Sequence, residues 1–130
     1  MIAVVDTNIL VSALWTPNGN ASFFMSKVIN GTVKPCYDNR MLSEYRAVLK
    51  RPKFCFPPHM VDSLLGMFAF NGIKVMPSKL TSVTLIDEDD RPFYEVAKFC
   101  NAPLVTGNLK HYPPDPLVMT LADYINTYLI

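Results

Sequence analysis

The stretch that decides the fold is Met1–Leu14, MIAVVDTNILVSAL, at the start of the 130-residue chain. Within it, Ile2–Val5 is an uninterrupted apolar run rich in β-branched residues, which is typical of a strand buried on both faces of a parallel sheet. The run stops at Asp6, and Thr7 and Asn8 are residues that favour the start of a helix. The stretch therefore predicts a carboxylate where a buried strand gives way to a helix, and that edge of an open α/β sheet binds ligands.

Asp6 has two interpretations at this point. It caps the helix that follows it, or it binds a metal ion, because a charged group beside a buried strand needs a partner that offsets its desolvation. Two other classes of site lack their residues. A haloacid-dehalogenase-type phosphatase requires a second Asp where this chain has Asn8, and a dinucleotide site or P-loop requires glycines, none of which precedes Gly19. A metal-binding carboxylate would need further ligands from elsewhere in the chain.

Length and composition predict one domain over residues 1–130, large enough for a substantial core. Half of the residues are hydrophobic, but no apolar run approaches the ~18 residues that span a membrane. No basic region precedes the first apolar run, as a secretory signal would require. The three cysteines (Cys36, Cys55 and Cys100) are scattered and form no CxxC pair, which indicates free thiols in a reducing compartment. We therefore expect a cytoplasmic protein that has no membrane partner.

Strand-like and helix-like segments alternate along the rest of the chain. Further strands are predicted over Val33–Tyr37, Ile73–Met76, Pro103–Thr106 and Leu117–Met119. Helices are predicted from about Asn20 to Gly31, over Asn39–Arg51, over about His59–Phe70, from Asp89 or Asp90 onward, and over Leu121–Leu129. Pro35 should place its strand at a sheet edge or at a strand end. The alternation predicts an α/β fold with a central, mostly parallel sheet and helices on both faces.

Two more acidic residues border apolar faces of predicted helices. Glu44 adjoins the apolar stripe of Asn39–Arg51, so it can face the interior of the fold. The alternative is a solvated residue that pairs with Arg40 or Lys50. Asp90 belongs to a run of four carboxylates, which is usually a solvated helix start, but it alone projects onto the apolar face of the helix that follows.

The ends of parallel strands share one edge of a sheet, so residues far apart in sequence can meet there. We expect Asp6, Glu44 and Asp90 to form one carboxylate cluster of this kind. Three ionised carboxylates need a cation, and Mg²⁺ or Mn²⁺ is the expected choice for oxygen ligands. Such an ion activates water for the hydrolysis of a phosphodiester.

The chain resembles PIN domains over nearly its whole length. The resemblance rests on four segments in order: VVDTNILVSAL, the helix that carries Glu44, DEDDRPFYEVA and LVTGNLKHYP. The chain is similar in particular to prokaryotic PIN proteins described as toxin components of toxin–antitoxin pairs. This resemblance implies a three-layer α/β/α sandwich, metal-dependent cleavage of RNA and a cognate antitoxin as a partner.

The resemblance also implies roles for individual residues. The acidic, metal-binding and catalytic positions of the family fall on Asp6, Glu44 and Asp90, and supporting polar positions fall on Thr7, Asn8 and Thr106. One position departs from the pattern, because many PIN domains carry Asp after the TG motif and this chain has Asn108. Asn108 can coordinate through its carbonyl oxygen but brings no negative charge, so a second metal ion should be held less strongly.

Two hypotheses about function remain. The first is a PIN-type ribonuclease whose metal-activated water attacks RNA, with Lys50, Arg51, Lys53, Lys110 and His111 guiding the phosphate backbone. For any one of these basic residues, ordinary solubilising surface is the alternative. The second is a catalytically weak or inactive module that binds RNA or a partner protein. Aromatic and Met residues over Pro58–Phe70 are expected to contact an antitoxin or a second copy in a homo-oligomer.

Overall fold

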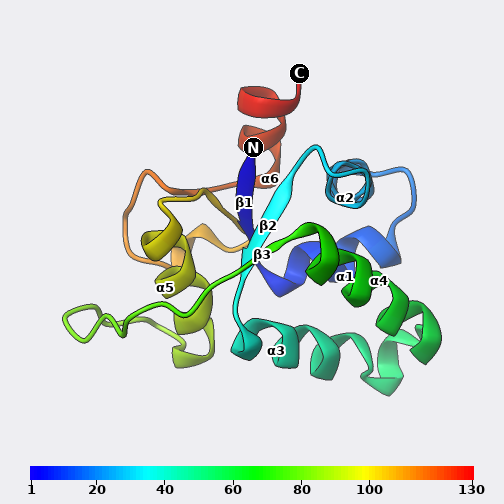
Figure 1. Ribbon diagram of the computed structural model, residues 1–130, viewed down its shortest axis with the longest axis horizontal. Helices are drawn as coiled ribbons and strands as arrows, with labels where there is room; N and C mark the ends of the chain where they lie inside the picture. Colours follow the sequence, from blue (N-terminus) through cyan, green and yellow to red (C-terminus); the bar gives the residue numbers. More distant parts are fainter.

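The computed structural model describes all 130 residues, and its five strands form one parallel sheet in the order β3-β2-β1-β4-β5 (Figure 1). The strands are β1 (Ile2–Val5), β2 (Lys34–Tyr37), β3 (Ile73–Lys74), β4 (Leu104–Val105) and β5 (Val118–Met119). In the register of the sheet, β1 lies at the centre, with Ala3 opposite Pro35 and Val4 opposite Leu104. The predicted first strand is confirmed, and Ala3, Val4 and Val5 are fully buried.

Helices cover both faces of this sheet. They are α1 (Thr7–Trp15), α2 (Asn20–Ile29), α3 (Asn39–Leu49), α4 (Pro58–Asn71), α5 (Arg91–Cys100) and α6 (Leu121–Tyr124), which continues as a π-turn over Ile125–Leu129. Short 3₁₀ turns lie at Pro52–Phe54, Glu88–Asp90 and Leu109–His111. Helices α1 to α4 lie on one side of the sheet and α5 on the other, where it packs against β1, β2 and β4 (Figure 1). The predicted α/β/α sandwich with a parallel sheet is confirmed.

The strand order follows from the direction of the connections. The chain passes from β1 to β2 and on to β3 through helices of one layer, and α5 then returns it across the opposite face to β4. The order therefore reverses beside β1, and β1 and β4 lead their connections to opposite faces. In open α/β sheets a crevice forms outside the carboxyl ends of such a strand pair, and ligands bind there.

Two aromatic residues bring α3 and α5 together beyond these strand ends. Tyr45 of α3 is fully buried, and its hydroxyl donates a hydrogen bond to the carbonyl oxygen of Val5 at the end of β1. Phe93 of α5 is also fully buried, and its ring centroid lies 5.9 Å from that of Tyr45. Since Glu44 precedes Tyr45 and Asp90 lies one turn before Phe93, this core contact places both acidic residues near the end of β1.

Pro35 does not lie in an edge strand, since β2 is flanked by β3 and β1. The other predicted position, a strand end, is the one that the structure supports. Pairing between β2 and β3 begins only at Cys36, so the missing N–H of Pro35 precedes that ladder. The predicted strand over Ile73–Met76 is shorter than expected, with two residues in β3.

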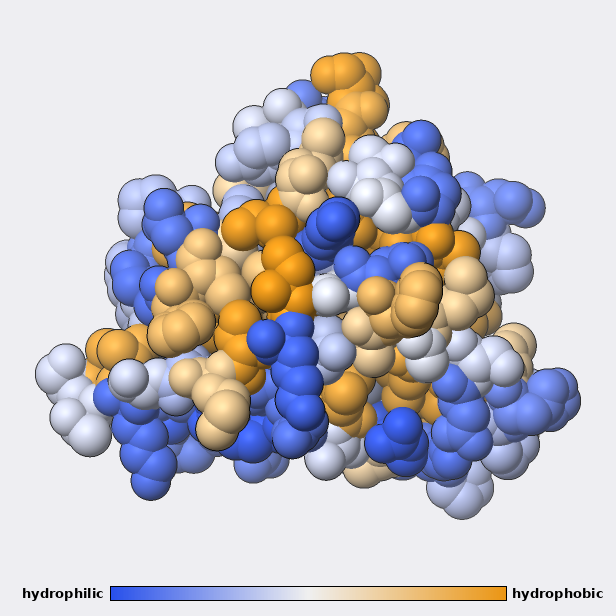
Figure 2. Space-filling model, viewed as in Figure 1, coloured by the Kyte–Doolittle hydropathy of each residue, from blue (hydrophilic) through white to orange (hydrophobic).

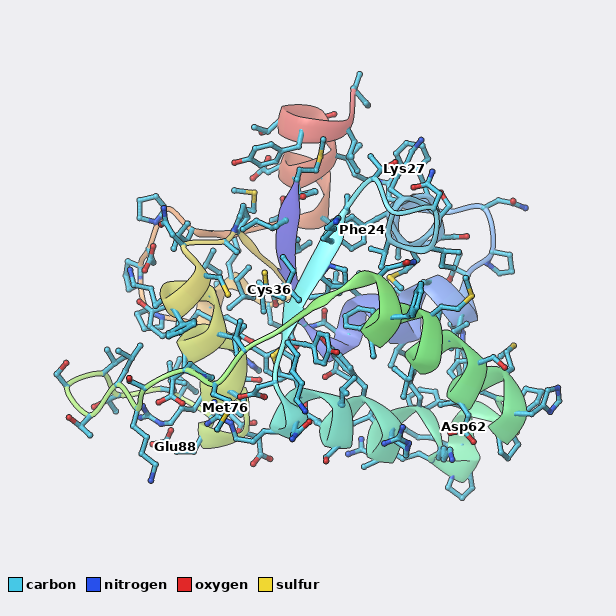
Figure 3. The ribbon with its side chains drawn as sticks, in the orientation of Figure 1. Phe24, Lys27, Cys36, Asp62, Met76 and Glu88 are labelled. Carbon is cyan, nitrogen blue, oxygen red and sulfur yellow. The ribbon has the colours of Figure 1, made fainter.

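The surface over the edge strand β3 is apolar in part. Figure 2 shows hydrophobic side chains along the middle of this face. Ile73 of β3 is exposed, and Met76 in the segment that follows β3 is 88% exposed (Figure 3).

All three cysteines are free thiols, as predicted. None of the helices combines the length and the apolarity that a bilayer crossing requires.

Candidate active site

A cleft of about 450 Å³ opens where the carboxyl ends of β1 and β4 meet α3 and the start of α5. All three of the acidic residues predicted for the site line this cleft, and so do three of the four predicted supporting or ligating polar residues. The residues that matter for its chemistry are Asp6, Thr7, Asn8, Glu44, Arg51, Phe54, Asp87, Asp89, Asp90, Asn108 and His111. The cleft is thus strongly acidic.

Asp6 is the buried carboxylate at the base of the cleft, with 6% of its surface exposed. It occupies the N-cap position of α1, but its side chain makes no capping hydrogen bond, so the helix-cap interpretation of that side chain is wrong. Its Oδ2 accepts hydrogen bonds from Thr106 Oγ1 at 2.7 Å and from the Tyr112 hydroxyl at 3.0 Å. Burial raises the pKa of Asp6 in spite of these bonds, and no cation forms a salt bridge with it.

Polar side chains also tie the end of β1 to the end of β4. The fully buried Thr106 donates to Asp6 and accepts a hydrogen bond from the N–H of Asn108 at 3.0 Å. The N–H of Gly107 donates to Asn8 Oδ1 at 3.1 Å. Thr106 and Asn8 therefore fix the geometry of the strand ends, and Asn108 lines the cleft with a side chain that makes no hydrogen bond within the chain.

Glu44 faces the cleft from α3. Its Oε2 accepts a hydrogen bond from Thr7 Oγ1 at 2.6 Å, so Thr7 of α1 orients it. The predicted alternative, a pair with Arg40 or Lys50, is wrong because both cations bind other carboxylates. Burial, followed by the negative charge of Asp6, raises the pKa of Glu44 although the Thr7 bond opposes this rise.

Asp90 precedes α5 and makes no capping hydrogen bond with it. Its side chain is 15% exposed, and its Oδ2 atom is buried without a hydrogen-bond partner. The Nδ1 atom of His111 lies 3.3 Å from this oxygen and forms an ion pair with it when the imidazole is protonated. Burial, with the negative charges of Asp6 and Asp87, raises the pKa of Asp90 to about 6.

The other carboxylates of the acidic run behave as a helix start. The side chain of Asp87 accepts a hydrogen bond from the N–H of Asp89 at 2.9 Å, which caps the short 3₁₀ turn. Glu88 points to solvent and pairs with Arg91 at 2.7 Å (Figure 3). The sequence therefore distinguished Asp90 from its neighbours by direction, although Asp87 and Asp89 also border the cleft.

The donors of the cleft match a hard cation in kind but are not assembled around one. No three His, Cys, Asp or Glu side chains lie close enough together to hold a metal ion. Carboxylates repel one another when no cation lies between them, which keeps such groups apart. Their oxygens are nevertheless the ligands that Mg²⁺ and Mn²⁺ take, and Asp90 Oδ2 is a buried acceptor without a partner. A cation shared by these residues requires their side chains to rotate toward it.

The predicted basic residues are divided by the structure. Arg51 and His111 line the cleft. Lys53 places its Nζ atom 5.1 Å above the ring of Phe54, which lines the cleft as well, and Lys110 lies beside His111 at a neighbouring hollow. Lys50 does not line the cleft, and it is held at 2.9 Å by Asp62 of α4, which is labelled in Figure 3.

Tyr112 is the site residue that sequence reasoning missed. It is 5% exposed, and its hydroxyl contacts Asp6 across 106 positions of sequence. The 3₁₀ turn Leu109–His111 directs the chain back toward β1, and a turn of three residues leaves no periodic signal. The only available hint was a Tyr in the segment that follows the TG motif.

The sequence model of one family, described as PIN domain, matches residues 3–110. The matched segment includes Asp6, Glu44, Asp90 and Asn108. No curated protein and no solved structure matches the chain. The match covers most of the chain and agrees with the parallel sheet and its acidic cleft. The chain therefore belongs to the PIN domain family, whose members are commonly nucleases and generally use divalent metal ions.

Proposed function

We propose that the protein is a metal-dependent endoribonuclease. One observation carries the proposal: Asp6, Glu44 and Asp90 line a single cleft of a PIN domain, and burial raises the pKa of each. Carboxylates in this condition gain from a cation, because the fold supplies Asp6 and Glu44 with hydroxyl and backbone N–H groups and Asp90 with an imidazole, but gives none of them a Lys or Arg partner. Cleavage of RNA phosphodiesters is the reaction that such a site supports.

In this proposal Asp6, Glu44 and Asp90 hold Mg²⁺ or Mn²⁺, with Asn108 as a further, neutral ligand. When bound, the ion lowers the pKa of a water molecule and offsets the charge that builds on the phosphodiester. Thr106 and Tyr112 keep the Asp6 carboxylate in place, and Thr7 does the same for Glu44. Arg51 and His111, on the walls of the cleft, attract the RNA backbone.

The test is degradation of single-stranded RNA by the purified protein with Mg²⁺ or Mn²⁺ and with EDTA. We expect cleavage only with metal, and a loss of about a hundredfold or more in Asp90→Asn, because the variant removes one ligand charge. The matched control is Asp123→Asn, which changes an exposed carboxylate at the start of α6. Equal cleavage by Asp90→Asn and the control would contradict the assignment.

A second candidate function is a module that binds RNA or a partner protein without turnover. Two observations favour it: no three potential ligands converge, and Asn108 is neutral where many PIN domains carry Asp. The same RNA separates the candidates, because a binding module binds it with EDTA present and does not cleave it when Mg²⁺ is added.

We further propose that the protein is the toxin of a toxin–antitoxin pair in the cytoplasm. Support comes from the resemblance to such toxins and from exposed apolar residues at the end of α4, where Met67 is 46% and Phe70 is 89% exposed. Together with Ile29 of α2 they border a shallow hollow that an antitoxin or a second copy can fill. Light scattering of the protein and of Phe70→Ser tests whether this surface forms a homo-oligomer.

A further inference from the structure

Three aromatic residues form a cluster beside the acidic cleft. Trp15 is the last residue of α1, and its ring centroid lies 5.4 Å from that of Phe54 and 6.1 Å from that of Phe56. Both phenyl rings meet the indole almost at right angles, with interplanar angles of 83° and 81°. Neither ring therefore stacks face to face on the indole.

The chain between the two Phe residues holds their rings parallel. Cys55 adopts a left-handed backbone conformation with φ 56°, which is uncommon for a residue other than glycine. The rings of its neighbours, Phe54 and Phe56, stack with centroids 5.5 Å apart and 9° between their planes. Phe56 packs against the hydrophobic core, so the stacked pair that contacts Trp15 is itself held in place. The cluster is built on two fixed elements instead of a free loop end.

The indole remains accessible in spite of these contacts. Trp15 is 57% exposed, and a large amphipathic ring in this position leaves apolar area in water that burial would remove. A Trp whose only role was to cover the Phe54–Phe56 stack would be expected to lose more of its surface. The exposed area is therefore available to a flat ligand.

Cations and the acidic cleft adjoin the same surface. Phe54 and Arg51 both line the cleft that contains Asp6, Glu44 and Asp90. The Nζ atom of Lys53 lies 5.1 Å above the Phe54 ring, and neither Arg51 nor Lys53 forms a salt bridge within the chain. Aromatic surface flanked by unpaired cations is the combination with which proteins hold single-stranded nucleic acid.

We propose that Trp15, supported by Phe54 and Phe56, is a stacking subsite for an unpaired base of the RNA substrate next to the bond that is cut. The proposal rests on the proposed ribonuclease function. Arg51 and Lys53 would contact the phosphates on either side of the stacked base. A duplex keeps its bases paired and stacked, so this subsite selects single-stranded RNA. Base–aromatic stacking contributes roughly five- to 150-fold to affinity per base.

Trp15 offers a direct signal because it is the single Trp of the chain. We would titrate wild type, with EDTA to prevent cleavage, with a short single-stranded RNA and with the same RNA carrying abasic residues. The intact RNA should quench the fluorescence of Trp15, because the base stacks on it, and the abasic RNA should not. Equal quenching by the two would overturn the proposal, because phosphate contacts alone would then account for it.

Substitutions give the second measurement. Trp15→Ala should weaken the binding of intact RNA about tenfold and leave the binding of abasic RNA unchanged, whereas Trp15→Phe should retain most of the affinity. Phe99→Ala, which removes a 56% exposed ring of α5 that does not line the cleft, is the matched control and should bind as wild type does. Circular dichroism checks that each variant is folded. If Trp15→Ala does not fold, the affinity of Trp15→Phe and the quenching of wild type still test the proposal.

Cleavage of the same intact RNA by wild type with Mg²⁺ separates this proposal from the proposed function. Cleavage without selective quenching, or with unchanged affinity in Trp15→Ala, overturns the stacking subsite and leaves the ribonuclease in place. Wild type that neither binds nor cuts the RNA overturns both.

Discussion

Asp6 and Glu95 are two buried carboxylates that the fold treats in opposite ways. Asp6 is 6% exposed and Glu95 is 1% exposed, so each loses most of its hydration. Glu95 Oε1 accepts a hydrogen bond from Arg40 at 2.8 Å, and its Oε2 accepts one from the N–H of Leu80 at 2.8 Å. Burial acts to raise the pKa of Glu95, but the Leu80 and Arg40 bonds outweigh it and lower the pKa. For Asp6, burial outweighs the hydrogen bonds from two hydroxyl groups and from the backbone of Thr7, and its pKa is raised.

The difference lies in what each carboxylate does for the chain. Glu95 joins α5 to Arg40 of α3 and to Leu80 in the segment before α5. Arg91 also holds this segment, because it donates hydrogen bonds to the carbonyl oxygens of Leu80 and Val83. The charge of Glu95 is balanced by partners that hold the fold together. The charge of Asp6 faces a cleft and is left without a cation, which costs stability. A buried carboxylate whose charge the fold leaves unbalanced is a better indicator of a site than burial alone.

The largest expected effect is on catalysis. Asp6→Asn should reduce cleavage of single-stranded RNA by about a hundredfold or more, because it removes a ligand charge and retains the shape of the side chain. Glu95→Gln should stay within about threefold of wild type at a temperature where it is folded, since Glu95 lies outside the cleft. A larger loss in Glu95→Gln than in Asp6→Asn, measured in initial rates, would reverse the comparison.

Glu95→Gln should instead destabilise the protein by about 2 kcal/mol, because it gives Arg40 and the N–H of Leu80 a neutral acceptor in place of a charged one and leaves Arg40 with Asp38 as its one ionic partner. The Arg40 side chain is 43% exposed to water, which keeps the loss below that of a fully buried pair. Urea denaturation at pH 7 measures the change. A free energy of unfolding equal to that of wild type would mean that the pair contributes nothing net.

Asp6→Asn should have the opposite effect on stability. With EDTA we expect the variant to be more stable than wild type by roughly 0.5–2 kcal/mol, because it removes one of several like charges from a partly desolvated cleft. Saturating Mg²⁺ should narrow or reverse this gap, because it binds the native wild type more tightly. Thermal melts of both proteins in both buffers decide the matter, and a gap that ignores Mg²⁺ would count against the carboxylate cluster.

The pH dependence of stability should separate the two kinds of carboxylate. Asp90 has a folded-state pKa of about 6, above its unfolded value of about 3.9. Its contribution to stability is therefore present at pH 4 and is lost as the pH rises to about 6. Glu95 has a lowered pKa, so its contribution is present above its unfolded pKa and is lost as the pH falls through the folded value.

Asp90→Asn should accordingly reduce the decline in stability of wild type between pH 4 and 7 by about 1 kcal/mol with EDTA. Glu95→Gln should leave that decline unchanged and should flatten the loss of stability below pH 4.5. Denaturant titrations at a series of pH values measure both slopes. Parallel curves for wild type and Asp90→Asn would show that Asp90 titrates normally.

The smallest expected effect concerns Asn108. Asn108→Asp adds a charge at the rim of the cleft, so it should tighten Mg²⁺ binding about fivefold, or roughly 1 kcal/mol. It should also lower stability slightly with EDTA, because it increases the repulsion that Asp6 already experiences. Calorimetric titration with Mg²⁺ measures the affinity, and weaker or unchanged binding would place Asn108 outside the metal site.

Sequence patterns predicted the fold and the acidic residues of the site because both depend on local rules. The Ile2–Val5 run, the strand end at Asp6 and the apolar face beside Asp90 are visible as composition and periodicity. Partners that meet only through the tertiary structure were not visible. Tyr112 on Asp6 and Arg40 on Glu95 are side-chain contacts across 106 and 55 positions of sequence, and neither follows from a spacing rule. For the same reason Glu95 was not singled out, and Lys50 was predicted to guide the RNA backbone although Asp62 binds it.

The hydrogen bonds on Asp6 also fix when the cleft can be completed during synthesis. Asp6 leaves the ribosome well before its partners Thr106 and Tyr112, which follow 100 and 106 positions later. The strand that orders Thr106 is β4, which pairs with β1 only after α5 has been made. A nascent chain that ends before β4 therefore carries Asp6 in water as an ordinary carboxylate, and the acidic cleft first forms once the chain through Tyr112 has been translated.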